Sequence, residues 1–108
     1  MSAHRKQQVE QLITQSAADF LARESNRQSL ITITRTSISP DFKNATVYFT
    51  VLPQEHEDHA LAFVKRNVNE FRRFIKKHMH LKTLPFFSFV VDEGEKHRQR
   101  LDDLSSPA

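Results

Sequence analysis

Two stretches of the 108-residue chain repeat apolar residues every three or four positions, which is the spacing of an amphipathic helix. The first covers residues 4–23, with Ser2 as a candidate N-cap, and the second covers residues 57–80. The second stretch is long for a chain of this size and contains Asn67 and Asn69, which are weak helix formers. Because Asn also tolerates left-handed backbone conformations, we expect two helices or one kinked helix there.

Three other stretches have the character of strands. Residues 30–38 are rich in Ile and Thr, residues 45–52 alternate between two faces, and Pro85 opens an apolar run that ends at residue 91. Residues 39–41 (Ser-Pro-Asp) have turn chemistry, so we expect an antiparallel hairpin. The pattern breaks at residues 25–27, and the chain is polar after Asp92. The predicted order is α-β-β-α-α-β, an α+β fold with helices on one face of a three-stranded sheet.

Length and composition narrow the choice of function. We expect one domain over residues 1–104 and a flexible tail at 105–108. No apolar stretch approaches the roughly 18 residues that span a bilayer and no secretory h-region is present, so we expect a cytoplasmic protein without a membrane partner. The chain has one Gly and no Cys. With a single Gly it cannot form a glycine-rich phosphate loop or a dinucleotide-binding turn, and without Cys it cannot carry out thiol chemistry.

The basic residues are concentrated in one region. Residues 65–82 carry a net charge of +6, whereas the rest of the chain carries −3. The basic residues of this region are Lys65, Arg66, Arg72, Arg73, Lys76, Lys77 and Lys82, and its one acid is Glu70. On a continuous helix the six basic residues between positions 65 and 77 lie opposite the apolar residues. A concentrated basic patch on an otherwise slightly acidic chain is typical of a protein that binds a phosphate backbone.

We predict that these seven basic residues contact phosphates, with Arg72 and Arg73 first because a guanidinium binds phosphate bidentately. Asn67 and Asn69 are predicted to shape the kink or to touch RNA. Arg5, Lys6 and Arg35 are predicted to extend the footprint. Three alternatives stay open: a solvated face that serves solubility, a generic RNA- or DNA-binding protein, and an adaptor whose basic helix meets an acidic protein.

Neither a metal site nor catalysis is expected. Residues 56–59 (His-Glu-Asp-His) resemble the zincin signature, but the two His are three positions apart instead of four, with no evident third ligand. No Ser/His/Asp arrangement can be recovered from the spacing. We therefore expect a protein that is not an enzyme and has no cofactor, no metal and no small-molecule substrate.

Several segments together resemble one family. Residues 38–50 (ISPDFKNATVYFT) match a pattern of the form hydrophobic-S-x-D-hydrophobic-x-x-A-x-V-Y-hydrophobic, and residues 79–89 match a basic, leucine-containing junction with a following Pro. Asp92 and residues 100–104 (RLDDL) match a closing Asp and an R-hydrophobic-x-x-L segment. In these segments, and in its element order, the chain resembles the ribosome-binding factor A family, a group of type II KH-like domains.

The resemblance implies a ribosome assembly factor. It would bind rRNA of the immature small (30S) ribosomal subunit and assist maturation of the 16S rRNA 5′ end without chemistry of its own, and we expect a monomer. In that family an A-x-G interruption replaces the G-x-x-G loop of KH domains, and the matching positions here are Asn67, Val68 and Asn69. Without G-x-x-G, phosphate contacts to structured RNA are expected instead of a grip on four unpaired nucleotides.

Overall fold

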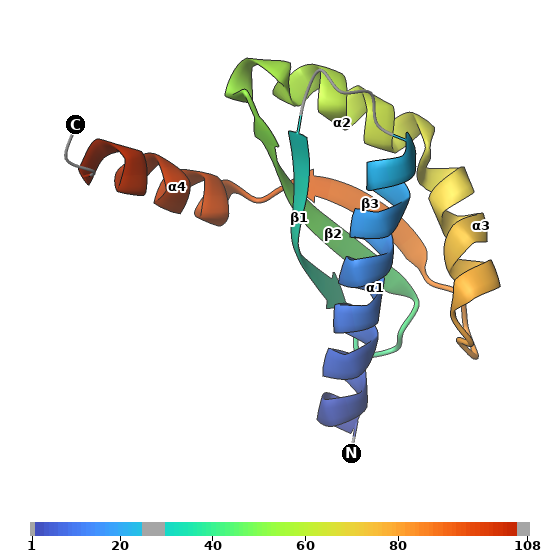
Figure 1. Cartoon of the computed structure of the whole chain (residues 1–108). Coiled ribbons are helices and arrows are strands. Elements are labelled where there is room, and N and C mark those ends of the chain that lie inside the picture. The colour runs from blue at the N-terminus through green and yellow to red at the C-terminus, as the bar shows by residue number, and fades with distance from the viewer. Residues whose placement is uncertain (1, 25–29, 106–108) are drawn as a thin grey trace.

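The computed structural model describes residues 2–24 and 30–105. The elements in chain order are α1 (Ser2–Glu24), β1 (Leu30–Ile38), β2 (Asn44–Leu52), a 3-10 turn η1 (Gln54–His56), α2 (Glu57–Arg66), α3 (Val68–His78), β3 (Phe86–Val91) and α4 (Glu93–Ser105) (Figure 1). The α+β class and the predicted order are confirmed as far as β3, whereas α4 was not predicted. The predicted break at residues 25–27 and all but the first residue of the predicted tail lie outside the described residues.

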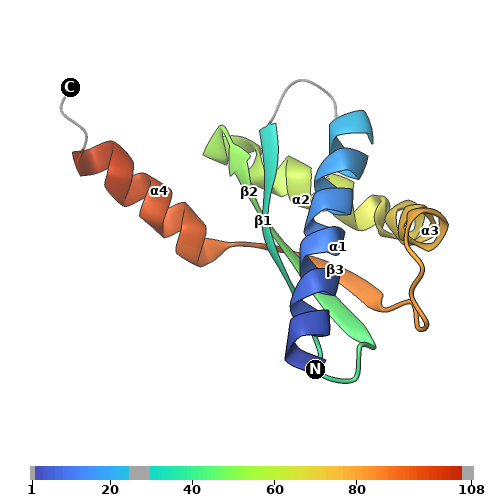
Figure 2. The same ribbon diagram turned by 60° about the horizontal axis from the view of Figure 1, so that its bottom comes forward.

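The sheet has β2 at its centre. The hairpin partner β1 pairs with it antiparallel, and β3 pairs with it parallel. A parallel neighbour requires a crossover connection, which α2 and α3 supply. In Figures 1 and 2, α2 lies across one end of the sheet, and α3 then continues in a different direction from α2. Contacts link α3 to both β3 and α1. The crossover therefore brings the basic segment to the β3 edge.

The three helices α1, α2 and α3 cover one face of the sheet and form the core there. The side chains that this face contributes include Val47 and Phe49 of β2 and Phe87 and Phe89 of β3, all buried as the alternation predicts. The ring of Phe71 on α3 packs edge-on against Phe87 and Phe89, with centroid distances of 4.9 and 5.4 Å. Burying side chains of this size stabilises the fold by about 1.5–3 kcal/mol each.

The other side of the sheet, here called the open face, is not covered by α1, α2 or α3. Its strand residues include Arg35, Ser37, Thr46, Tyr48, Phe86, Ser88 and Val90. Phe86 and Val90 are exposed. Thr50 also alternates onto this side but is buried, and α4 contacts β2. The predicted division between the faces is therefore right, while the protection of Thr50 depends on tertiary structure.

Side-chain hydrogen bonds close the predicted hairpin turn. Ser39 donates its hydroxyl to Asp41, and the Asp41 carboxylate accepts the backbone N–H of Lys43 at 3.0 Å. The hydrogen bonds from Ser39 and Lys43 lower the pKa of Asp41. Phe42 adopts a positive φ of 61°, and its side chain packs against the core. The turn thus fixes the register between β1 and β2.

The unpredicted α4 starts at a capping carboxylate. Asp92 is buried, and its Oδ1 accepts the backbone N–H of Glu95 at 3.1 Å, as in a helix N-cap. One turn into the helix, Lys96 pairs with Glu57 at the start of α2, with 3.0 Å between Nζ and Oε2. The hydrogen bond to Glu57 raises the pKa of Lys96. Since α4 has few apolar residues, periodicity did not reveal it, and its cap and this long-range ion pair account for its position.

Candidate nucleic-acid interface

The predicted break in the basic segment is confirmed at Asn67. α2 ends at Arg66 and α3 begins at Val68, while Asn67 has φ −101° and ψ 8°. These angles lie in the bridge region, so the break does not use the left-handed conformation that Asn tolerates. The Asn67 side chain instead stabilises the break: its Nδ2 donates a hydrogen bond of 2.8 Å to the Phe63 carbonyl. The same carbonyl also accepts the backbone N–H of Asn67 at 3.1 Å, so Asn67 binds the last turn of α2 through both its side chain and its backbone.

Six of the predicted basic residues are exposed on α2, on α3 and on the segment that follows α3. This set, here called the cationic surface, consists of Lys65, Arg66, Arg73, Lys76, Lys77 and Lys82. On the opposite side of the same helices, Val64, Phe71 and Ile75 are buried in the core. The segregation of basic and apolar residues that helical periodicity predicts is therefore maintained across the break.

The cationic surface has little internal compensation. Among the residues that the structure describes, only Arg73 of this set forms an ion pair, with Glu70 one turn earlier on α3. Both partners are well exposed, and such pairs contribute little to stability. Lys65, Arg66, Lys76, Lys77 and Lys82 have no ion-pair partner within the described part of the chain. Their field is free to act on an external anion.

Arg72 differs from its predicted companions. It is half-buried, and its guanidinium donates from Nη2 to the Leu84 carbonyl and from Nε to the Pro85 carbonyl, each at 3.2 Å. The same group lies over the Phe86 ring, 4.8 Å from the centroid. Arg72 thus fastens α3 to the start of β3. Helical periodicity grouped Arg72 with the other basic residues of the segment. It could not indicate the Leu84 and Pro85 carbonyls, because they come close to Arg72 only in the folded chain.

The other predicted contacts are distributed unevenly. Asn69 is exposed on the first turn of α3, beside the cationic surface in sequence. Arg5 and Lys6 lie in the first turns of α1, at the end of the molecule away from α2 (Figure 1). Arg35 points from β1 onto the open face. The structure therefore joins the α2 and α3 residues into one surface and separates Arg5, Lys6 and Arg35 from it.

An aromatic stack that the sequence did not indicate lies at the end of α3. The His78 ring stacks on Phe74 with a centroid distance of 4.2 Å, and its Nδ1 lies 2.9 Å from the Phe74 carbonyl. On the α1 side, the Arg23 guanidinium lies 5.7 Å from the centroid of Phe74. His78 is exposed at the C-terminal end of α3, next to Lys77 of the cationic surface.

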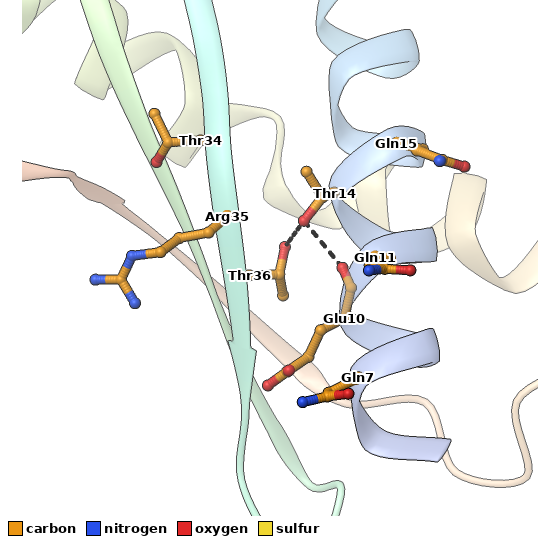
Figure 3. Close-up of a pocket in the computed structure, with 8 residues that line it drawn as sticks. All are labelled: Gln7, Glu10, Gln11, Thr14, Gln15, Thr34, Arg35 and Thr36. Atoms are coloured by element: carbon orange, nitrogen blue, oxygen red, sulfur yellow. Dashed lines mark hydrogen bonds between the residues drawn. The ribbon is translucent and has the colours of Figure 1, made fainter. Parts of the chain in front are cut away.

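A polar groove between α1 and β1 is a separate feature (Figure 3). Across it, Thr14 donates a hydrogen bond of 2.9 Å to the hydroxyl of Thr36. The Glu10 carboxylate accepts the backbone N–H of Ile38 at 2.8 Å. The second bond occupies one backbone N–H of the edge strand β1, and the first ties the side chains of α1 and β1 together. Figure 3 also shows Arg35 pointing away from α1, to the other side of the strand.

On that other side, Arg35 makes two contacts. Its guanidinium lies over the Tyr48 ring at 3.7 Å from the centroid, and its Nε is 3.4 Å from the Asp92 carboxylate. Asp92 also accepts the Thr34 hydroxyl at 2.6 Å. Burial opposes ionisation of Asp92, but the hydrogen bonds from Thr34 and the Glu95 N–H, together with the Arg35 charge, outweigh it and lower the pKa.

Comparison with known proteins decides the family. Residues 5–105 match the family model described as ribosome-binding factor A. The chain belongs to the ribosome-binding factor A family. A ribosome-binding factor A from Paracoccus denitrificans is 38% identical, with 94% of this chain and 75% of that protein covered. One from Coxiella burnetii is 31% identical, with 94% of this chain and 87% of that protein covered.

A solved structure agrees with the fold. The crystal structure of ribosome-binding factor A from Thermus thermophilus superposes with a TM-score of 0.72 over 80% of this chain and 94% of that chain, at 18% identity. The family match and the relatives confirm the predicted family resemblance, and this structure agrees with the fold. Within this family fold, the break that Asn67 makes between α2 and α3 sets the course of the cationic surface.

The described residues contain neither a metal-binding cluster nor a membrane-spanning helix. No group of three or more His, Asp or Glu side chains is arranged to hold a metal ion there, and His59 of the His-Glu-Asp-His segment is exposed on α2. Likewise, none of the helices in the described ranges combines the length and apolarity needed to cross a bilayer.

Proposed function

We propose that this chain is a ribosome assembly factor that binds rRNA of the immature small subunit through the cationic surface. Its relatives are named for binding the ribosome, and the family match covers nearly the whole chain. The observation that carries the proposal is a run of exposed basic side chains on two consecutive helices, with one acid among them. Phosphate is the anion that such a surface meets along a structured RNA.

The proposed role at the ribosome is non-catalytic. The protein binds as a monomer and assists maturation of the 16S rRNA 5′ end by holding the precursor RNA. Lys65, Arg66, Arg73, Lys76, Lys77 and Lys82 contact phosphates, Asn69 lies beside the bound backbone, and Asn67 keeps the two basic helices at their angle. Arg72 contributes through its hold on the start of β3 as well as through its charge.

The first experiment measures binding to a structured fragment of small-subunit precursor rRNA over a range of salt concentrations. Six phosphate contacts, at about 0.9 each, predict a log–log slope near −5. In Lys76→Gln/Lys77→Gln the slope becomes shallower by about 2, because each lysine accounts for about one unit. Lys43→Gln/Arg98→Gln, a control that removes the same charge elsewhere, keeps the wild-type slope. A flat slope for the wild-type protein contradicts rRNA binding by this surface.

A second experiment tests the ribosomal role. The wild-type protein is expected to co-sediment with free small subunits, and Lys76→Gln/Lys77→Gln is expected to be lost from them. In cells lacking the gene, 5′-extended 16S precursor accumulates, and the control variant but not the cationic-surface variant restores maturation. Binding to RNA without co-sedimentation favours a generic nucleic-acid-binding protein. Co-sedimentation that the cationic-surface variant loses, without binding of the wild-type protein to the isolated rRNA fragment, favours an adaptor whose basic helix meets an acidic protein.

A further inference from the structure

The open face of the sheet carries the chemistry of a second RNA-binding surface. The three strands contain a single charged residue, Arg35, and no acid. Two arginine–aromatic stacks lie on this face or at its edge: Arg35 over Tyr48 at 3.7 Å, and Arg72 over Phe86 at 4.8 Å. Aromatic rings and guanidinium planes are the groups on which unpaired bases stack.

The outer layers of both stacks are accessible. Phe86 is 67% exposed. It lies at the start of β3, where the fold does not require an apolar side chain. The Arg35 side chain is 57% exposed and covers Tyr48, so its guanidinium is the outward layer of that stack. Its Nε faces Asp92, while its two Nη groups make no hydrogen bond to the described residues. They are available to a phosphate or a base.

The strand register sets the spacing between the stacks. Tyr48 pairs with Val90, and Phe86 precedes Val90 by four residues on β3. At about 3.3 Å per residue the stacks are ~13 Å apart along the strands, far beyond the ~3.4 Å rise between stacked bases of one strand. Between them, Thr46 and Ser88 are register partners with hydroxyl groups that can donate or accept. This spacing fits an extended, unpaired segment and not a duplex.

The open face is also continuous with the cationic surface. Arg72 stands next to Arg73 on α3, yet its guanidinium reaches the β3 side, where it binds the Leu84 and Pro85 carbonyls and stacks on Phe86. We infer that an unpaired RNA segment adjoining the structured RNA crosses the β3 edge at Arg72 and Phe86 and stacks along the open face as far as Arg35 and Tyr48. The inference builds on the proposed function, since it assumes rRNA on the cationic surface.

The test compares a blunt RNA hairpin with the same hairpin carrying about six unpaired nucleotides, a length within the usual range of single-strand sites. The extension is expected to raise the affinity of the wild-type protein at least about fivefold, which corresponds to one stacked base. Phe86→Leu, which keeps an apolar side chain but removes the ring, is expected to lose most of this gain. Phe86→Tyr retains the gain, and neither change affects binding of the blunt hairpin.

A second variant and a second readout are independent of Phe86. Arg35→Gln lies at the far end of the face and is expected to reduce the same gain, with folding verified by thermal unfolding. Tyr48 is the one tyrosine of the chain, which has no tryptophan, so intrinsic fluorescence reports on this face alone. Emission, corrected for RNA absorbance, is expected to change with the extended hairpin and to stay constant with the blunt one.

Three results would overturn the inference. They are no gain in affinity from the extension, a gain that Phe86→Leu and Arg35→Gln both retain, or Tyr48 emission that the extended hairpin does not change. If the variants lose small-subunit binding while their RNA affinities are unchanged, a protein occupies the open face and the inference is wrong. Failure of the proposed function gives a different result. In that case the affinity for the blunt hairpin depends neither on the salt concentration nor on the Lys76→Gln/Lys77→Gln change.

Discussion

The Thr34 hydroxyl donates a hydrogen bond of 2.6 Å to the carboxylate of Asp92, which lies 58 positions further along the chain. This bond connects β1 to the start of α4 across the end of the sheet. The same carboxylate caps α4 through the Glu95 N–H and faces the guanidinium of Arg35. The buried carboxylate of Asp92 therefore binds an edge strand, a helix terminus and the arginine of the open face.

Asp92→Ala is expected to lower the free energy of unfolding by about 2 kcal/mol, because it removes an N-cap and leaves the Thr34 hydroxyl without its acceptor. Urea denaturation followed by circular dichroism measures the change. The control is Asp19→Ala, at an exposed position of α1, which is expected to stay within about 0.5 kcal/mol of wild type. Equal destabilisation by both changes would contradict the role assigned to Asp92.

The pH dependence of stability follows from the direction of the Asp92 shift. Its pKa in the folded state lies below the ordinary value of 3.8, so ionisation favours the folded state above that value. This contribution disappears as the pH falls through the folded-state pKa. The stability difference between wild type and Asp92→Asn is therefore expected to be constant from about pH 6 to 8 and to shrink below about pH 4. A difference that grows in acid would reverse this assignment.

Substitutions of Arg72 and Arg73 are expected to differ in their effect on the free energy of unfolding, although the two residues are adjacent on α3. Arg72→Gln breaks two hydrogen bonds to carbonyls and should cost about 1–2 kcal/mol, while Arg73→Gln breaks an exposed ion pair and should cost less than about 0.5 kcal/mol. Chemical denaturation of the two variants measures both values. Arg72→Lys should not restore stability, because an ammonium group cannot reproduce the forked geometry. Full rescue by Lys would show that charge alone matters there.

Asn67 is expected to stabilise the break between α2 and α3. Asn67→Ala removes the hydrogen bond to the Phe63 carbonyl and favours a continuous helix, so it should cost about 1 kcal/mol in thermal or urea unfolding. Asn69→Ala, in the first turn of α3, is the matched control and should be neutral or slightly stabilising, because Ala is the better helix former. The prediction fails if the two substitutions have the same effect.

Periodicity was sufficient wherever one element buries one face. The strand at residues 30–38, the alternation around Val47 and the separation of Lys76 from Ile75 all follow from the local order of apolar and polar residues. These features depend on residues a few positions apart, so a sequence window contains the whole signal. The cationic surface could be predicted for the same reason.

Features that depend on distant partners could not be predicted in this way. Lys96 meets Glu57 across a separation of 39 residues, and Arg72 binds carbonyls that carry no side-chain signal. The bridge conformation of Asn67 was not predicted either, and in it the side chain binds a backbone carbonyl of the preceding helix. In each case the deciding contact exists only once the fold has formed.

The anchoring of α4 has a consequence for motion. Its first turns are held by Asp92 and Lys96, and Figure 1 shows the rest of the helix pointing away from the sheet. Isolated helices of 13 residues are marginal in water. Amide hydrogens beyond Lys96 should therefore exchange with solvent long before those of β2, whose exchange requires global opening. The distal half of α4 is thus a separate unit of local unfolding, with a stability that a bound partner can raise without altering the rest of the domain.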